Sequence, residues 1–108
     1  MTIPGYIDSI AAGAFSDSNV EQLIIPDHVK FLPKSAFIWN SKLKKVSLPS
    51  HLTEIPNGMF MGCSSLTSIM LPESIKIIGD DGFMYCMSLK SIKLPEGLEK
   101  IGEYAFSA

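Results

Sequence analysis

The sequence predicts a β-rich repeat solenoid, and three regularities support this prediction. Prolines recur at intervals of 22, 23, 23 and 23 residues, at Pro4, Pro26, Pro49, Pro72 and Pro95. A phenylalanine stands eleven residues after each proline, at Phe15, Phe37, Phe60, Phe83 and Phe106. The pattern Leu-x-x-Ile-x-Leu-Pro, clearest at residues 66–72, repeats with the same period. Such a period is typical of a stacked coil, so residues 1–108 are predicted to form one domain of about four to five repeats of 22–23 residues.

The first part of each unit is predicted to be a short strand. Ile69 and Leu71 are two residues apart, and this period of two indicates a strand with both apolar side chains pointing inward. Pro72 follows directly and has no N–H, so it ends the strand and turns the chain. The same pattern recurs at Leu23 and Ile25, at Val46 and Leu48, and at Ile92 and Leu94.

The second part of each unit is predicted to be another extended piece or an irregular turn. Ile75, Ile78 and Phe83 are three to five residues apart with Gly79 among them, which does not favour a long helix. Stacked units are expected to bury these columns in a continuous core, with the phenylalanines as an aromatic ladder. The residues that follow the phenylalanines, Ile38, Met61 and Met84, are expected to join this core.

Neither end carries the polar cap that closes most solenoids. The first unit opens on Ile3 and Ile10, and the last leaves Ile101 and Phe106 without a following unit. The predicted sheet edges would also present unpaired backbone groups. We therefore expect a fragment of a longer array, or ends that self-associate with other copies.

Composition narrows the classes of partner. Hydrophobic residues make up 46% of the chain and the formal net charge is −2, which suits a folded domain and does not favour nucleic acid as a partner. Apolar runs are short and interrupted, so membrane insertion by this segment is not expected.

Residues 66–72, followed by Ile75, Ile78, Phe83 and Cys86, resemble the BspA-like, or Treponema-type, leucine-rich repeat family. The five-fold recurrence extends this resemblance over nearly the whole chain. The resemblance implies a right-handed leucine-rich-repeat coil with a short parallel sheet on one face. It also implies a cell-surface or secreted location and a role in adhesion or host-protein binding. The second unit departs from the pattern, because Ser18 replaces the cysteine and one residue is missing.

Residues between the inward-pointing positions are expected on the outer face of the sheet. The lysines alternate by unit, which predicts two basic stripes with a Thr/Ser/Met row between them. This face is either a solvated surface or a docking surface for a protein or an acidic glycan. The candidate ligand-binding residues there are Lys44, Lys45, Ser47, Thr67, Met70, Lys90 and Lys93.

Two aromatic residues just past the phenylalanines complete the candidate site. Trp39 and Tyr85 recur less regularly than their neighbours, with Gly62 between them in the same column. They are either part of the cover of the core or exposed anchors for a ligand, since such residues contribute disproportionately to binding energy.

No pattern in the sequence favours catalysis, a metal or a cofactor. Cys63 and Cys86 share a column with Asn40 and are expected to be free, buried thiols. His28 and His51 are expected to be an exposed pair that lacks further metal ligands. The acidic pair at positions 80 and 81 is expected to be a solvated turn.

The sequence therefore predicts a non-catalytic repeat module of a cell-surface, adhesin-type protein that binds a protein or glycan through the exposed sheet face. The alternative is a structural spacer or self-assembling unit that stacks end to end.

Overall fold

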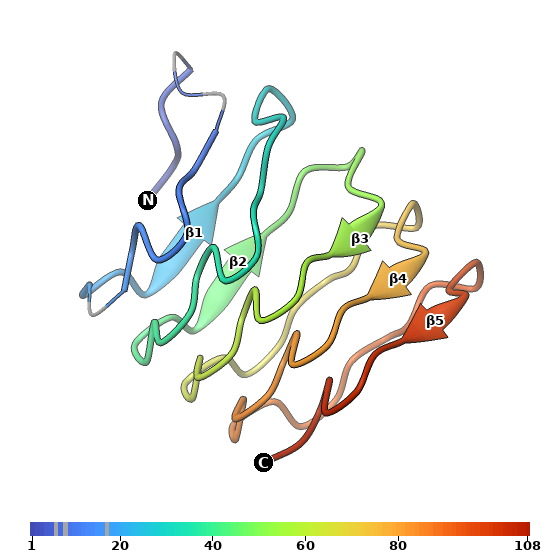
Figure 1. Cartoon of the computed structure of the whole chain (residues 1–108). Coiled ribbons are helices and arrows are strands. Elements are labelled where there is room, and N and C mark those ends of the chain that lie inside the picture. Colours follow the sequence, from blue (N-terminus) through green and yellow to red (C-terminus); the bar gives the residue numbers. More distant parts are fainter. Residues whose placement is uncertain (6, 8, 17) are drawn as a thin grey trace.

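The computed structural model describes residues 1–5, 7, 9–16 and 18–108, and it shows a stack of similar turns with the two termini at opposite ends (Figure 1). No helix occurs in these ranges. The coil measures 33 × 26 × 19 Å. The predicted solenoid is confirmed. Its strands are β1 (Gln22–Ile24), β2 (Lys45–Ser47), β3 (Glu54–Ile55), β4 (Ile77–Ile78) and β5 (Lys100–Ile101).

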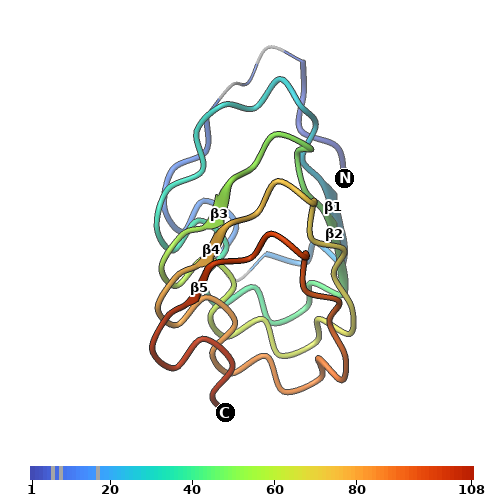
Figure 2. The same ribbon diagram turned by 90° about the vertical axis from the view of Figure 1, so that its right-hand side faces the viewer.

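Two parallel sheets lie on opposite sides of the coil (Figure 2). β1 pairs with β2, and β3, β4 and β5 form the second sheet in that order. In the second sheet Ile55, Ile78 and Ile101 stand in one row, one unit apart. The second predicted segment is thus extended, and the expectation of a sheet on one face alone was incomplete.

The first sheet is shorter than the sequence predicts. Beyond β2 it continues only as an isolated bridge between Met70 and Lys93. Among the described residues, the third and fourth units are joined on this side by one long backbone hydrogen bond. The Thr67 N–H donates to the Lys44 carbonyl at 3.4 Å. Ile69 and Leu71 are nevertheless buried as predicted. Inward packing of apolar side chains therefore persists where the hydrogen-bond ladder does not.

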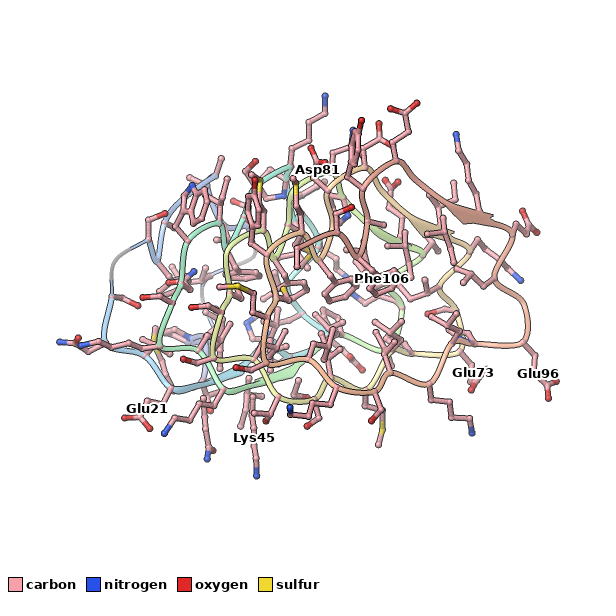
Figure 3. The ribbon with its side chains drawn as sticks, turned by 90° about the horizontal axis from the view of Figure 1, so that it is seen from below. Glu21, Lys45, Glu73, Asp81, Glu96 and Phe106 are labelled. Atoms are coloured by element: carbon pink, nitrogen blue, oxygen red, sulfur yellow. The ribbon has the colours of Figure 1, made fainter. Side chains whose placement is uncertain are left out.

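The phenylalanine column forms the predicted aromatic ladder. Successive rings of Phe15, Phe37, Phe60, Phe83 and Phe106 stack with centroids 5.9, 5.7, 5.4 and 5.4 Å apart. The three interior rings are fully buried. In the last turn the ring of Phe106 still points into the coil (Figure 3) but is 41% exposed.

The core assignment of the residues after the phenylalanines was wrong. Ile38, Met61 and Met84 are only half-buried and lie outside the main hydrophobic cluster. The residue before the ring is the buried one in the later units, as with Ala36, Met59 and Ala105, whereas Ala14 in the first unit is exposed. Because the ring itself fills the interior, the side chain after it is directed toward the surface.

Each turn passes through left-handed backbone at fixed places, a feature that the sequence analysis did not predict. Two residues before each phenylalanine, φ lies between 57° and 70° in every unit. Glycine suits this conformation, whereas other residues pay roughly 1–2 kcal/mol for it. This column comprises Gly13, Ser35, Gly58, Asp81 and Tyr104.

Within the described residues, no helix has both the length and the apolar character needed to cross a lipid bilayer.

Candidate functional site

The predicted sheet-face residues all lie on the surface. Lys45 and Ser47 project from β2, opposite Gln22 and Ile24 of β1. Lys45 points away from the coil on the side opposite Asp81 (Figure 3). All seven predicted positions are exposed, namely Lys44, Lys45, Ser47, Thr67, Met70, Lys90 and Lys93.

The positive charge of this face is only partly compensated. Lys44 Nζ lies 3.3 Å from Glu21 Oε1, with both side chains more than half exposed. Such surface pairs contribute between 0 and about 1 kcal/mol, but they do offset local charge. Lys45, Lys90 and Lys93 form no ion pair with any residue in the described part of the chain. The uncompensated charge therefore belongs to these three lysines.

A hollow of about 460 Å³, which we call the sheet-face hollow, lies where the first sheet loses its pairing. It brings together Ser47, Met70 and Lys93, which the sequence analysis placed on three different units. The Met70 side chain is 85% exposed. The other lining residues are Val46, Leu48, Ser50, Leu71, Pro72 and Glu73. The hollow is thus mostly apolar, with one basic and one acidic residue.

The structure brings Trp39 and Tyr85 together, although they are two units apart. Their rings stack with centroids 6.0 Å apart and an interplanar angle of 21°. Gly62 makes this possible, because a Cβ atom at that position would collide with indole Cε3 of Trp39. Trp39 is 47% exposed and Tyr85 is half-buried.

These aromatic residues stand in a second left-handed column. Trp39, Gly62 and Tyr85 have φ values of 60°, 79° and 61°. The two aromatic residues together are strained by roughly 2–4 kcal/mol, while a stacked pair contributes roughly 0.5–1.5 kcal/mol beyond its buried area. Stacking alone therefore does not offset the strain.

A second hollow of about 490 Å³ lies beside the stack, and we call it the aromatic hollow. Its lining consists of Trp39, Ser41, Gly62, Ser64, Tyr85 and Met87. None of these residues carries a charge. Ser41, Ser64 and Met87 were not among the predicted site residues.

The two cysteines are free and buried, as predicted, and the side chains of their column form a hydrogen-bonding ladder. The Cys63 thiol donates to the Phe37 carbonyl at 3.3 Å, and the Cys86 thiol to the Phe60 carbonyl at 3.1 Å. Asn40 donates to the Phe37 carbonyl from its amide at 2.8 Å. Burial raises the pKa of Cys63 to about 12 and that of Cys86 to about 11. Both thiols are free and stay protonated at neutral pH.

The histidines join neighbouring units and are not simply an exposed pair. Nε2 of His28 hydrogen-bonds the Pro4 carbonyl at 2.9 Å, and His28 is half-buried. Nε2 of His51 lies 3.1 Å from the carbonyl oxygens of both Asp27 and Val29. Each imidazole ring reaches back over the preceding turn and hydrogen-bonds its backbone. No cluster of three potential metal ligands exists among the described residues.

The acidic turn residues also have a structural role that the sequence did not reveal. The backbone N–H of Asp80 donates to Asn57 Oδ1, and Asp80 Oδ1 accepts from the Glu103 N–H, both at 2.8 Å. Asp80 is exposed and Asp81 half-buried. Side-chain oxygens therefore link three successive turns along this edge.

A family model described as "BspA type Leucine rich repeat region (6 copies)" matches residues 1–108. A leucine-rich cell surface protein from Faecalibacterium prausnitzii is similar in structure, with a TM-score of 0.92 and 36% identity over 99% of this chain. A leucine-rich repeat protein from Bacteroides ovatus (TM-score 0.91, 35% identity) matches 96% of this chain, and the Treponema pallidum leucine-rich repeat protein (0.88, 33%) matches 98%. The match spans 28%, 27% and 52% of those three chains, respectively. No curated protein gave a significant match.

Proposed function

This chain belongs to the BspA-type leucine-rich repeat family, and from that premise we propose that it is a non-catalytic binding module of a cell-surface, adhesin-type protein. It engages a protein or acidic glycan through the face that bears β1, β2 and the Met70 bridge. The observation that carries this proposal is the sheet-face hollow, where the exposed Met70 lies beside Lys93.

Physical chemistry favours this face as a docking surface. An exposed apolar side chain in a concave site gains free energy when a partner covers it. Lys45, Lys90 and Lys93 add an uncompensated positive field that attracts acidic groups and raises the association rate. Glu73 lines the sheet-face hollow near Lys93, but Glu73 and Glu96 both lie away from Lys45 in Figure 3, so acidic groups approaching near Lys45 meet little repulsion from them.

Two further observations support the proposal. One concerns the cell-surface location, and the other concerns the non-catalytic role. The similar Faecalibacterium protein is described as a cell surface protein, which favours the same location here. The described cysteine thiols are held protonated by burial, so they are poor nucleophiles.

The test measures binding of the purified chain to two immobilised anionic probes, heparin and poly-glutamate, by biolayer interferometry at low and physiological salt. We expect at least one probe to bind and the Lys45→Glu/Lys93→Glu variant to bind it at least tenfold more weakly. Lys100→Glu is the matched control, because Lys100 is an exposed lysine on β5 of the opposite sheet. Failure of both probes to bind, or equal losses in sheet-face and control variants, would refute the proposal.

A second candidate function is an assembly unit that stacks end to end. It is favoured by the last turn, where Ile101 and Phe106 are 47% and 41% exposed while Ile78 and Phe83 one unit earlier are buried. Light scattering after size exclusion would show a mass that rises with concentration and falls to 11.8 kDa in Ile101→Glu. A constant monomer mass would exclude this candidate.

A further inference from the structure

The column of Trp39, Gly62 and Tyr85 places bulky aromatic residues where the backbone favours glycine. All three residues have left-handed φ values, and only Gly62 adopts this conformation without strain. Strained backbone of this kind clusters at binding sites, where the surrounding structure holds it in place. Beyond its buried area, the aromatic stack contributes less than the strain costs, so the ring contact by itself does not offset the strain.

The aromatic hollow beside the stack contains apolar surface and uncharged hydrogen-bonding groups. Ring surface from Trp39 and Tyr85, together with Met87, supplies the apolar part. The hydroxyls of Ser41, Ser64 and Tyr85 and the indole N–H make no hydrogen bond to the described residues of the chain. All the side-chain polar groups of the lining residues are therefore available to hydrogen-bond a ligand.

This combination selects a ligand by its chemistry. The absence of charged lining residues disfavours an ionic ligand. Hydroxyl groups in the protein both donate and accept, and so match a ligand that also does both. A proline-rich peptide offers apolar rings and mainly carbonyl acceptors, because proline lacks an N–H, whereas a pyranose has an apolar C–H face and a rim of hydroxyls that both donate and accept.

The size of the aromatic hollow is also compatible with a ligand that contains pyranose rings. Trp39 and Tyr85 lie on units two repeats apart, but their rings meet over Gly62 with centroids 6.0 Å apart, so the hollow lies beside the stacked rings and not between them. Its volume of about 490 Å³ lies within the usual range for a small-molecule site.

We propose that the aromatic hollow binds a neutral saccharide, with a pyranose ring against the indole of Trp39 and its hydroxyls hydrogen-bonded to Ser41, Ser64 and Tyr85. This inference rests on the proposed binding function but uses a site that does not involve the sheet-face lysines. It assigns a neutral glycan, and not an acidic one, to this part of the surface.

The sequence supplies a direct probe, because Trp39 is the only tryptophan. Tryptophan emission is followed while the purified chain is titrated with neutral mono- and disaccharides of glucose, galactose, mannose, fucose and N-acetylglucosamine. We expect a saturable change with at least one sugar at millimolar concentration. Tyr85→Ala should lower the affinity for that sugar at least tenfold, and Ser64→Ala should lower it about threefold.

Tyr104→Ala is the matched control, since Tyr104 is also exposed and left-handed but does not line the hollow. Tyr85→Phe keeps the ring and removes one hydrogen bond, so it should weaken binding only about threefold, as Ser64→Ala does, which separates loss of the ring contact from misfolding. The proposal is overturned if no sugar changes the emission, if only a proline-rich decapeptide does so, or if Tyr104→Ala weakens binding as much as Tyr85→Ala. Lys45→Glu/Lys93→Glu should leave sugar binding unchanged, so the two proposals fail independently.

Discussion

The ring of Phe83 stacks on the ring of Phe60 at 5.4 Å with an interplanar angle of 12°, although 23 residues separate them in the sequence. Phe60 is also stacked on Phe37, at 5.7 Å, so its ring has an aromatic neighbour on both sides. The interior of the coil therefore contains a column in which the three middle rings, Phe37, Phe60 and Phe83, are each buried by the units before and after them.

Replacing Phe60 by alanine should lower the free energy of unfolding by about 3–5 kcal/mol, because it leaves a cavity between two rings. Phe106→Ala should cost clearly less, since Phe106 has one stacked neighbour and is 41% exposed. Urea denaturation followed by circular dichroism measures both values. Equal losses in the two variants would contradict the ladder as the core of the fold.

The repeat period and the alternation of apolar residues were sufficient to predict the coil and most of its core columns, with the exception of Ile38, Met61 and Met84, while the family resemblance supplied the parallel sheet. Leu23 pairs with Val46, and Ile55 with Ile78, at the spacing that the prolines set. This succeeded because every unit must bury the same columns against its neighbours. The extent of pairing in the first sheet could not be predicted, because Ile69 and Leu71 remain buried without a full ladder.

The left-handed columns and the contact between Trp39 and Tyr85 could not be predicted from the apolar pattern. Left-handed backbone is usually signalled by glycine, but only Gly13 and Gly58 give that signal in a column that also holds Tyr104. Gly62 looked like an interruption between two aromatic residues, whereas its missing side chain is what lets them meet. A comparison of glycine positions between units would have revealed the conformation of both columns.

Gly62→Ala should destabilise the protein by more than Gly13→Ala. Both substitutions place a side chain on left-handed backbone, which costs about 1 kcal/mol. Only the new Cβ at Gly62 collides with Trp39, whereas at Gly13 the nearest atom is the Ser16 hydroxyl at 3.4 Å. We expect Gly62→Ala also to move the tryptophan emission to longer wavelength as the ring is displaced. An unchanged emission spectrum would argue against the packing of Trp39 over Gly62.

Tyr104→Gly should be more stable than Tyr104→Ala by about 1 kcal/mol, which reverses the usual order of these residues. The reason is the φ of 57° at Tyr104, in the column that holds Gly13 and Gly58. Both variants remove the same, mostly exposed ring, so their difference isolates the backbone conformation. Thermal melts of the two variants provide the comparison, and a more stable alanine variant would mean that this turn is not left-handed.

The buried thiols should make stability fall at alkaline pH. Burial raises the pKa of Cys63 from 9.0 to about 12 and that of Cys86 to about 11. The folded chain therefore keeps protons that the unfolded chain loses. This stabilisation is complete below about pH 9 and is lost as the pH rises toward the folded values, by roughly 1 kcal/mol per thiol at pH 10.

The matched variant is Cys63→Ser/Cys86→Ser, whose hydroxyls can donate to the same carbonyls of Phe37 and Phe60 but do not titrate in this range. The two proteins differ only at positions 63 and 86, so the difference between their pH dependences reports the thiols. Urea denaturation at pH 8 and pH 10 should show the wild type losing about 2 kcal/mol more than the variant. If the free energy of unfolding falls equally in the wild type and the variant, the two thiols are not desolvated in the folded chain. The assignment of Cys63 and Cys86 to a buried column would then be wrong.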